Sequence, residues 1–363
     1  MPKPDIPELI YLGRSRLHRN RANLIQTLHT VAALTEIGIT TRLYLPPWHN
    51  NATPDQRLHE MGIASRPEIR ASQLLHRRWP ASAFARFHKR LLRNAQAVYV
   101  RSPELSLGLA SLGIVHHFEV HALQPMIRQG VLTKVLDYHR QGLIGQLIPI
   151  SRSAATALVE AGADRHRIHV SPSGVDLSAY QTIPPLDPQR LAEPRIVYLG
   201  RISRDRGLEI LTHLAERAMG EIRLVGDCDE RIPDYPRLSH RPAVPHRQVA
   251  GLYAQSELVL LPYQSDLLHA DGISPMKLFE AMAAGRPVIA SDIPPLREIL
   301  QHGRNALLAD PTDPLSWEDA VKRLMRDPEL ACQLAAQARQ DADAYSWPNR
   351  ASGIARAIGL RTH

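Results

Sequence analysis

The feature that most constrains the fold is an alternation of short apolar runs with longer helical segments. In the first half of the chain the apolar runs lie at 8–13, 40–45, 97–102, 114–121 and 147–151. A helical segment over 21–37 has apolar residues at helical spacing, namely Leu24, Leu28, Val31 and Leu34. No Asn-Gly or Asp-Gly hairpin turn joins any of these runs. The alternation therefore predicts βα units and a parallel sheet.

A second series of apolar runs follows the Pro-rich segment TIPPLDPQRLAEP at 182–194, which is the best candidate for a linker. These runs lie at 195–200, 221–226, 258–263, 287–291 and 305–310, and the segment from 314 to 358 is helical. With 363 residues, the chain is more than twice as long as a typical domain. We therefore predict two doubly wound, Rossmann-like α/β domains facing a cleft, at 1–180 and 190–343, with a last helix in 344–363. Because ligands bind beyond the carboxyl ends of parallel strands, the loops there should carry the site.

Cysteine is nearly absent, which excludes two classes of protein. Cys228 and Cys332 are far apart in the sequence, so neither a disulfide scaffold nor a zinc module is expected. The N-terminal stretch MPKPDIPELIYLG is too polar for a secretion signal, and no apolar run approaches the roughly 18 residues that span a bilayer. We expect a cytoplasmic protein that is at most peripheral, on the inner face of the membrane.

The net charge of +8 and the pI near 9.7 indicate an anionic partner. Between 66 and 94 there are eight Lys and Arg residues and one acid, interleaved with Leu, Phe and Trp. This pattern favours docking on an anionic membrane surface. A core-packing helix with a solvated basic face is the alternative. Nucleic acid is not expected as a partner, because no recognisable binding module is present.

The segment GRISRDRG at 200–207 directly follows an apolar run and opens a helix. Gly200 permits a sharp turn, and Arg201 and Arg206 flank the turn where both could reach a phosphate. The N-terminus of a helix adds free N–H groups to such a site. The alternative is a solvated basic loop, but its place after a strand favours phosphate binding.

The segment GISPMKLFEAMAAGRPVIAS at 272–291 reads as a short helix followed by a buried strand. Ser274 is a suitable N-cap and Pro275 a suitable first helical residue, while Gly285 suits the end of the helix. Glu280 could accept two hydroxyl hydrogen bonds from a ribose. The alternative is an ordinary surface pair between Lys277 and Glu280.

Two further patterns bear on chemistry. His121 ends the apolar run that contains Glu119, where it could donate a hydrogen bond to a substrate or act as a base. Asp227-Cys228-Asp229 has a spacing that can hold a divalent ion, but the pattern is short enough to arise by chance, and no metal site is expected. Neither a P-loop nor a Gly-x-Gly-x-x-Gly fingerprint is present.

Taken together, these motifs resemble the retaining, two-domain GT-B glycosyltransferases of family 4. YLGRISRDRG is similar to that family's Arg-x-x-x-x-Lys loop, with Arg206 in place of Lys, and SPMKLFEAMAAGRPVIAS is similar to its nucleotide motif. FEVHAL, SRSAATALVEAG with VSPSGVD, and YSWPNRA resemble other family segments, and the resemblance covers most of the chain.

The resemblance implies a role for each candidate. Arg201 and Arg206, after Gly200, would neutralise the diphosphate leaving group. Backbone N–H groups over Ser274, Pro275, Met276 and Lys277 would help to bind it. Glu280 would hold the ribose, while His121, with Glu119, is the catalytic candidate that contacts the transferred sugar. Gly13 would let the backbone approach donor or acceptor. The reaction would need no cofactor or metal, and the last helix would cross back onto the first domain.

The chain departs from the family pattern at two places. Gly272 stands where relatives carry a first acid, eight residues before Glu280, and Asp271 is one position away. The first loop reads GRSRLHRNRAN at 13–23 and lacks the family's pair of glycines. We expect transfer of a hexose-type sugar from a nucleotide-diphosphate sugar to a glycan or lipid-linked acceptor. The alternatives are a nucleotide-sugar epimerase of the same architecture, or a binding subunit with impaired catalysis.

Overall fold

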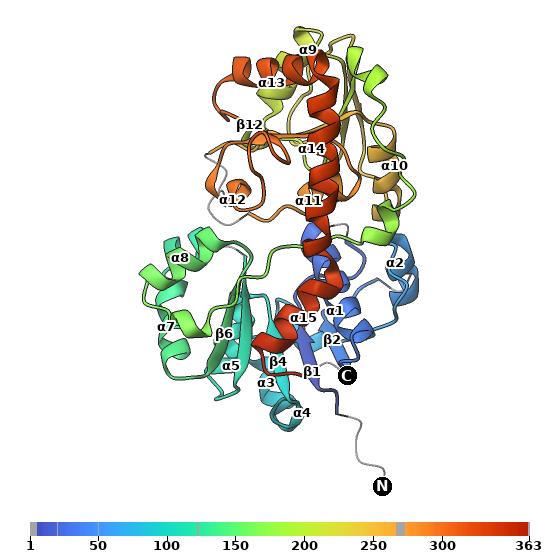
Figure 1. Ribbon diagram of the computed structural model, residues 1–363. Helices are drawn as coiled ribbons and strands as arrows, with labels where there is room; N and C mark the ends of the chain where they lie inside the picture. Colours follow the sequence, from blue (N-terminus) through green and yellow to red (C-terminus); the bar gives the residue numbers. More distant parts are fainter. Residues whose placement is uncertain (1–5, 20, 50, 122, 266–272, 362–363) are drawn as a thin grey trace. The chain divides into compact units, whose positions relative to one another are not determined.

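The computed structural model describes residues 6–19, 21–49, 51–121, 123–265 and 273–361 (Figure 1). The chain forms two compact units. Unit 1 contains residues 1–173 and 347–363, and unit 2 contains residues 174–346. The chain thus passes into unit 2 after Ser173, a few residues before the expected limit at 180, and the last helix belongs to unit 1.

Unit 1 is built on a six-stranded parallel sheet with the order β3-β2-β1-β4-β5-β6. The strands are β1 (Leu9–Leu12), β2 (Thr41–Leu45), β3 (Glu68–Ala71), β4 (Ala97–Val100), β5 (His116–Val120) and β6 (Ile144–Pro149). The helices are α1 (Ala22–Glu36), α2 (Pro54–Glu60), α3 (Ala83–Phe87), α4 (Lys89–Asn94), α5 (Pro103–Ala110), α6 (Leu123–Arg128), α7 (Val131–Arg140), α8 (Arg152–Glu160) and α15 (Trp347–Ala357).

Side chains alternate between the two faces of this sheet. Ile10, Val98 and Phe118 point into a core with the apolar residues of α5 and α7. Tyr11, Tyr99 and Glu119, one position along, point to the other face, where α1 and α15 lie against each other (Figure 1). Glu119 therefore enters the layer that the last helix covers.

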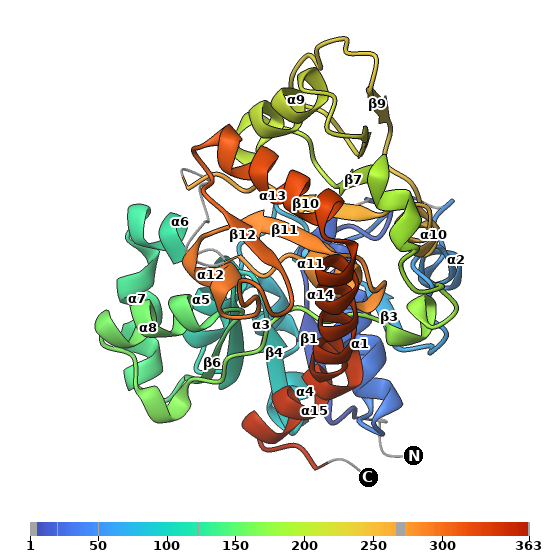
Figure 2. The ribbon, with the colours of Figure 1, turned by 45° about the horizontal axis from the view of Figure 1, so that its top comes forward.

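Unit 2 repeats this design. Its parallel sheet has the order β12-β11-β10-β7-β8-β9, and Figure 2 shows β10, β11 and β12 side by side. The strands are β7 (Arg195–Leu199), β8 (Glu221–Val225), β9 (Leu238–Arg241), β10 (Leu258–Leu261), β11 (Val288–Ser291) and β12 (Leu307–Ala309). The helices are α9 (Leu208–Glu216), α10 (Val249–Ala254), α11 (Met276–Ala283), α12 (Pro294–Arg297), α13 (Pro314–Arg326) and α14 (Pro328–Asp341).

The strand order fixes where ligands can bind. Numbered along each unit, both sheets run 3-2-1-4-5-6, the doubly wound order. The direction of winding therefore reverses between β1 and β4 in unit 1, and between β7 and β10 in unit 2. A crevice opens at such a point beyond the carboxyl ends of the strands.

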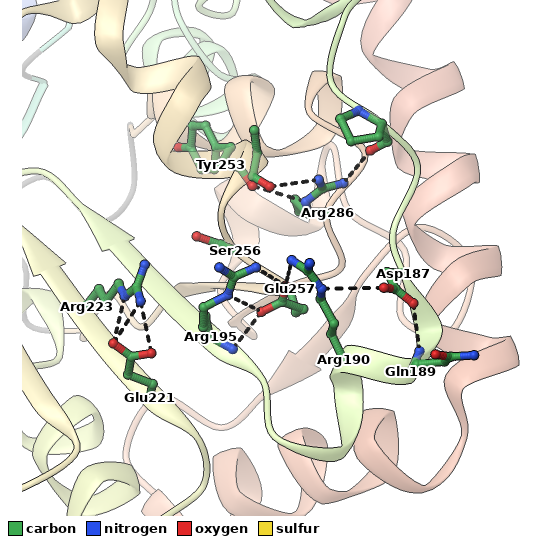
Figure 3. Close-up of polar contacts among 12 residues, drawn as sticks. Asp187, Gln189, Arg190, Arg195, Glu221, Arg223, Tyr253, Ser256, Glu257 and Arg286 are labelled. Carbon is green, nitrogen blue, oxygen red and sulfur yellow. Dashed lines mark hydrogen bonds and ion pairs between the residues drawn. The ribbon is translucent and has the colours of Figure 1, made fainter.

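At the amino ends of the unit 2 strands, a buried acid binds two arginines. Glu257, before β10, accepts hydrogen bonds from the backbone N–H and the side chain of Arg195 at 2.6–3.0 Å. Figure 3 shows Arg190, from the predicted linker, directed at the same carboxylate, with Nη1 3.9 Å from Oε1. Arg286 Nη1 also donates to the carbonyl of Pro184, at 3.1 Å. The segment 182–194 is thus held on unit 2, and this ion-pair cluster is structural.

Candidate functional site

The loop after β7 depends on its glycines. Gly200 has φ +118°, and a Cβ at Gly226, after β8, would lie 2.0 Å from the Gly200 carbonyl oxygen. Gly207, which precedes α9, has φ +82°, and a Cβ there would lie 2.1 Å from the carbonyl oxygen of Pro262. These close approaches bring the ends of β7, β8 and β10 together, and they require residues without a side chain.

Lys277, in the first turn of α11, sends its amine to the point where the sheet of unit 2 reverses. Nζ lies 3.8 Å from the ring centroid of Tyr198, in β7, and 5.1 Å from that of Tyr263, after β10. A Cβ at Gly200 would be 3.2 Å from Nζ, so Gly200 leaves the space that the amine uses. Nζ is buried and has no hydrogen-bond partner within the described ranges. Burial, and then the charge of Arg206, hold the pKa of Lys277 well below its ordinary value.

The two arginines of the loop differ in their placement. Arg206 ends the turn η5 (Arg204–Arg206), and its charge acts on Tyr198, Tyr263 and Lys277. Arg201 is exposed, with 61% of its side chain accessible, and pairs with Asp229. The structure therefore brings Gly200, Arg206 and Lys277 together, and directs Arg201 to the second acid of the Asp-x-Asp pattern.

The start of α11 differs from the prediction. The helix begins at Met276, and the N-cap position falls on Pro275, which has no side-chain cap. The assignment of Ser274 as N-cap and Pro275 as first helical residue is wrong by one position. Proline, which has no N–H and a fixed φ, is compatible with that place because the N-cap residue has extended backbone geometry. The predicted end is confirmed, since Gly285 has φ +62° directly after the C-cap.

Glu280 is buried in the last turns of α11, not exposed beside Lys277. Its Oε1 accepts from His246 Nε2 at 2.8 Å, and its Oε2 lies 3.4 Å from the Tyr253 hydroxyl. The surface-pair alternative for Lys277 and Glu280 is wrong, because Glu280 is buried and Lys277 Nζ is buried with no partner among the described residues. A carboxylate has about four lone-pair sites, so each oxygen of Glu280 can accept one more hydrogen bond.

The acids proposed for metal or sugar binding do not form a metal site among the described residues. Asp229 is engaged with Arg201, and within the described residues no group of three or more His, Cys, Asp or Glu side chains could hold a metal ion. Asp271 and Gly272, where relatives of the resembled family place a first acid, lie outside the described residues.

In unit 1, Glu119 lies at the centre of a buried polar network. The Tyr99 hydroxyl donates to its Oε2 at 2.5 Å, His121 Nε2 donates to its Oε1, and Arg350 Nη2 lies 3.1 Å from the same oxygen. Only 1% of the Glu119 side chain is exposed. Despite burial, the charge of Arg350 and the hydrogen bond from His121 hold the pKa of Glu119 well below its ordinary value. Glu119 is thus a carboxylate that orients its neighbours, and it is not accessible to a substrate.

His121 uses both ring nitrogens inside unit 1. Arg101 Nη2 donates to Nδ1 at 3.1 Å, so Nε2 carries the proton that is shared with Glu119. Burial, and then the charge of Arg101, lower the pKa of His121 to about 4. The ring is therefore neutral near pH 7. For Nδ1 to act as a base, its hydrogen bond with Arg101 would first have to break.

The C-terminal motif supplies the other half of this network. On α15, Arg350 donates to the carbonyl of Pro172 and to the hydroxyl of Thr30, both at 2.8 Å. The Trp347 ring stacks on His29 of α1, with centroids 5.1 Å apart. YSWPNRA thus attaches the last helix to the layer that holds Glu119. Sequence reasoning quoted this motif but missed Arg350 as the partner of Glu119.

Gly13 has a packing reason to be glycine. Its N–H donates to the carbonyl of Tyr44 at 2.9 Å, and a Cβ would lie 2.8 Å from Leu45 Cδ2. Gly13 therefore continues the pairing of β1 with β2. The loop that follows it contains Arg14, whose buried Nε and Nη2 have no hydrogen-bond partner in the described part of the chain.

The basic stretch 66–94 forms β3, η1 (Gln73–Leu75), α3 and α4. Phe84 and Leu92 enter the core, as the packing alternative expected. Phe87, 70% exposed, and Trp79, 42% exposed, do not. Arg77, Arg78, Arg86, Lys89, Arg90 and Arg93 are exposed in the same stretch. Among the described helices, none is both long enough and apolar enough to cross a bilayer.

Comparison with known proteins agrees with this geometry. Residues 193–327 match the family model described as glycosyl transferases group 1. That range contains the Gly200 loop, α11 and Glu280. This segment, which is less than half of the chain, is similar to the group 1 glycosyltransferases.

A curated protein that the chain resembles is the D-inositol 3-phosphate glycosyltransferase of Xylanimonas cellulosilytica. It is 29% identical over 235 residues, which cover 57% of this chain and 55% of the relative. The chain spans about half the length of the curated relatives it matches.

Two solved structures share the fold of this chain. Sucrose-phosphate synthase from Thermosynechococcus elongatus has a TM-score of 0.75 and 17% identity, covering 96% of this chain and 97% of that one. Anabaena Alr3699/HepE in complex with UDP has a TM-score of 0.74 and 17% identity, covering 97% and 99%. The predicted α/β fold of the GT-B type is confirmed.

Proposed function

We propose that the chain transfers a sugar from a nucleotide-diphosphate sugar to a glycan or lipid-linked acceptor, with retention of configuration and without a metal ion. The observation that carries this proposal is the environment of the Lys277 amine. The amine is buried at the reversal point of the unit 2 sheet, next to Gly200 and Arg206, with no acceptor bonded to it in the described residues. A buried cation without a partner is costly, so the site favours an anionic ligand.

The donor diphosphate fits this site. Arg206 and Lys277 would neutralise the charge that develops as the bond between the anomeric carbon and the diphosphate oxygen breaks. The N–H groups of Met276 and Lys277, in the first turn of α11, have no carbonyl four residues earlier within the helix and would add to the same site. Two side-chain cations and a helix terminus thus supply the positive charge that a metal ion would otherwise supply. Anabaena Alr3699/HepE, which shares the fold, was solved with UDP and with UDP-glucose.

The ribose and the transferred sugar have separate candidates. Glu280 would accept two ribose hydroxyls with the lone pairs that His246 and Tyr253 leave free. In unit 1, the neutral ring of His121 suits contact with an uncharged sugar better than proton abstraction. Glu119 would position His121 and would not itself touch the sugar.

The donor site can be tested by substitutions in the loop after β7 and in α11. We expect Arg206→Gln and Lys277→Met each to weaken UDP binding at least tenfold in calorimetry, because each removes a charge-assisted contact to the diphosphate. The matched control is Arg204→Gln, which removes an exposed arginine of the same turn that pairs with Glu209. Equal UDP affinity in all three variants would refute the site.

Product analysis separates sugar transfer from epimerisation. An epimerase converts the donor in the absence of an acceptor, whereas a transferase forms its product only when an acceptor is present.

The exposed basic stretch supports a membrane-bound acceptor. Phe87 and Trp79 offer apolar side chains to the headgroup boundary, and the arginines around them attract anionic lipid. We expect salt-sensitive co-sedimentation with vesicles that contain an anionic lipid. A variant with Arg86, Phe87, Lys89 and Arg90 replaced by Ser should stay in the supernatant while binding UDP normally. If the wild-type chain does not sediment at low salt, this part of the proposal fails.

A further inference from the structure

The loop between β1 and α1 contains buried polar atoms for which the described residues provide no partner. Arg14 Nε and Nη2, His18 Nδ1 and Asn23 Oδ1 all lie within the ten residues after Gly13. Native proteins rarely leave such groups unbonded, since each costs roughly 1–3 kcal/mol and more when charged. A guanidinium with two buried, unbonded N–H edges is therefore best explained by a ligand that bonds it.

The position of Arg14 is that of a ligand-binding residue. It follows β1 directly, where the unit 1 sheet reverses between β1 and β4. The segment after β4 brings Glu104 to the same place, since Glu104 and Arg14 influence each other's pKa. Doubly wound sheets bind their ligands at this point. The residues named for this site all belong to unit 1.

The surrounding charge is positive. Arg77, from the segment after β3, also acts on Arg14 and Glu104. Arg16 Nη2 lies 2.7 Å from His76 Nε2, so the first loop is in contact with that segment. Although burial opposes it, the Ser102 hydroxyl and the two arginines hold the pKa of Glu104 below its ordinary value. Two guanidinium groups, those of Arg14 and Arg77, thus act on one carboxylate, which leaves a net positive charge for an anion.

We propose that Arg14, with Arg77, binds a phosphate group carried by the acceptor. Arginine suits this role because its planar fork donates two parallel hydrogen bonds to phosphate oxygens. The identification of the ligand as the acceptor rests on the proposed transfer reaction, whereas the phosphate site itself does not. Glycosyl transfer would then act on a phosphorylated substrate that is held by unit 1.

Hydrogen exchange with glycerol 3-phosphate as the probe tests the site. We expect slower exchange in peptides that cover 9–19 and 72–79, with or without saturating UDP. Glycerol, which has no phosphate, should have no effect. Protection confined to peptides over 199–207 and 273–283 would show that the probe binds only the diphosphate site, and would overturn the proposal. Failure of UDP to bind would count against the donor site only.

Substitution of Arg14 distinguishes a binding role from a structural one. Arg14→Met should weaken glycerol 3-phosphate binding at least tenfold, while the melting temperature without ligand stays the same or rises, because an unbonded buried charge is removed. Arg14→Lys should give intermediate affinity, and Arg21→Met, an exposed residue at the end of the same loop, should bind normally. A large loss of melting temperature with unchanged affinity would overturn the proposal. Vesicles with phosphatidic acid, compared with the soluble probe, show whether the phosphate is a lipid headgroup.

Discussion

At the residue scale, the chemistry of this chain depends on polar groups that are buried before any ligand arrives. Lys277 is the clearest case. Its environment contains two tyrosine rings and an arginine, and no bonded acceptor within the described residues. The aromatic rings attract an ammonium ion, but burial favours the neutral amine. An entering diphosphate would favour the protonated amine, and the uptake of that proton can be measured.

We expect UDP binding to take up a proton on Lys277. Since the pKa of Lys277 is lowered in the free chain and rises beside a diphosphate, affinity should fall as pH rises between the two values, by at most about tenfold per pH unit. The effect should be sought above about pH 7, where the phosphate itself no longer titrates. Calorimetry in buffers of different ionisation enthalpy measures the proton.

Lys277→Met should remove both the proton uptake and the pH dependence, while Lys134→Met, an exposed residue of α7, should change neither. If the methionine variant takes up the same proton on binding UDP, the proton goes to another group and the role assigned to the Lys277 amine is wrong.

A second prediction concerns Glu119, which we infer to be a positioning residue. Glu119→Gln keeps the shape of the side chain but removes the charge that holds His121 and Arg350. We expect kcat to fall on the order of 100-fold, as for a misplaced catalytic group, with little change in KM for the donor. By NMR, the pKa of His121 should move further below its ordinary value, because the Glu119 charge is what raises it.

Glu160→Gln, an exposed acid of α8, is the control for this substitution. An unchanged kcat, or a pKa of His121 that rises in the Glu119→Gln variant, would exclude the positioning role.

At the element scale, most strands and helices could be predicted because they are buried or strongly periodic. The ten predicted apolar runs all became strands, but β3 and β9 were missed. Both are edge strands in which no residue is buried, so neither apolar runs nor alternation reveals them. A tertiary neighbour, β2 or β8, is what makes each of them a strand.

The residues of the candidate site could be predicted only where each lies in a recognisable local motif. Gly200 and Arg206 lie in the segment 200–207 and Lys277 in the segment 272–291, and the structure brings the three together. Arg350 and Glu119 are 231 positions apart, so no local pattern could pair them. Arg14 gave no signal either, because a missing hydrogen-bond partner is a property of the folded chain.

The attachment of α15 gives a stability prediction. Arg350→Met would leave the buried Glu119 without its main counter-charge, which should cost about 3–5 kcal/mol in the stability of unit 1. Arg356→Met, an exposed arginine on the same helix, is the control and should be nearly neutral. Calorimetry should show an earlier transition for unit 1 alone.

The double variant Glu119→Gln with Arg350→Met should recover part of the loss, because the uncompensated charge is gone. If the single Arg350→Met variant is as stable as the wild type, the ion pair does not hold the helix.

At the scale of the whole molecule, the two units share a topology but should differ in their response to acid. Unit 1 contains three histidines, His116, His117 and His121, whose pKa values burial lowers to about 4. In the unfolded chain each would titrate near 6.5. Between these values the unfolded chain binds protons that the folded chain does not, so the stability of unit 1 falls as pH falls from about 6.5 to about 4.

Glu119 acts in the same direction at lower pH. Its pKa is depressed in the folded chain, so its stabilising contribution is present above the ordinary carboxyl pKa and is lost as pH falls through the folded value. Each of the three histidines can contribute up to about 3 kcal/mol, at about 1.4 kcal/mol per pH unit. Unit 1 should therefore unfold first on acidification. The hydrogen bonds around His121 should be lost in the same transition.

Hydrogen exchange at pH 7, 5.5 and 4.5 can follow each unit separately. We expect peptides over β5 to lose protection at a higher pH than peptides over β7 and β10. In His116→Gln the loss should begin at lower pH, because one of the three proton sites is gone, and the side chain can still reach the Ser106 hydroxyl that lies 2.7 Å from Nε2 in the wild type. His166→Gln, an exposed histidine of unit 1, should leave the profile unchanged. Simultaneous loss of protection in both units would mean that the units unfold together, and acid sensitivity would then belong to the chain as a whole.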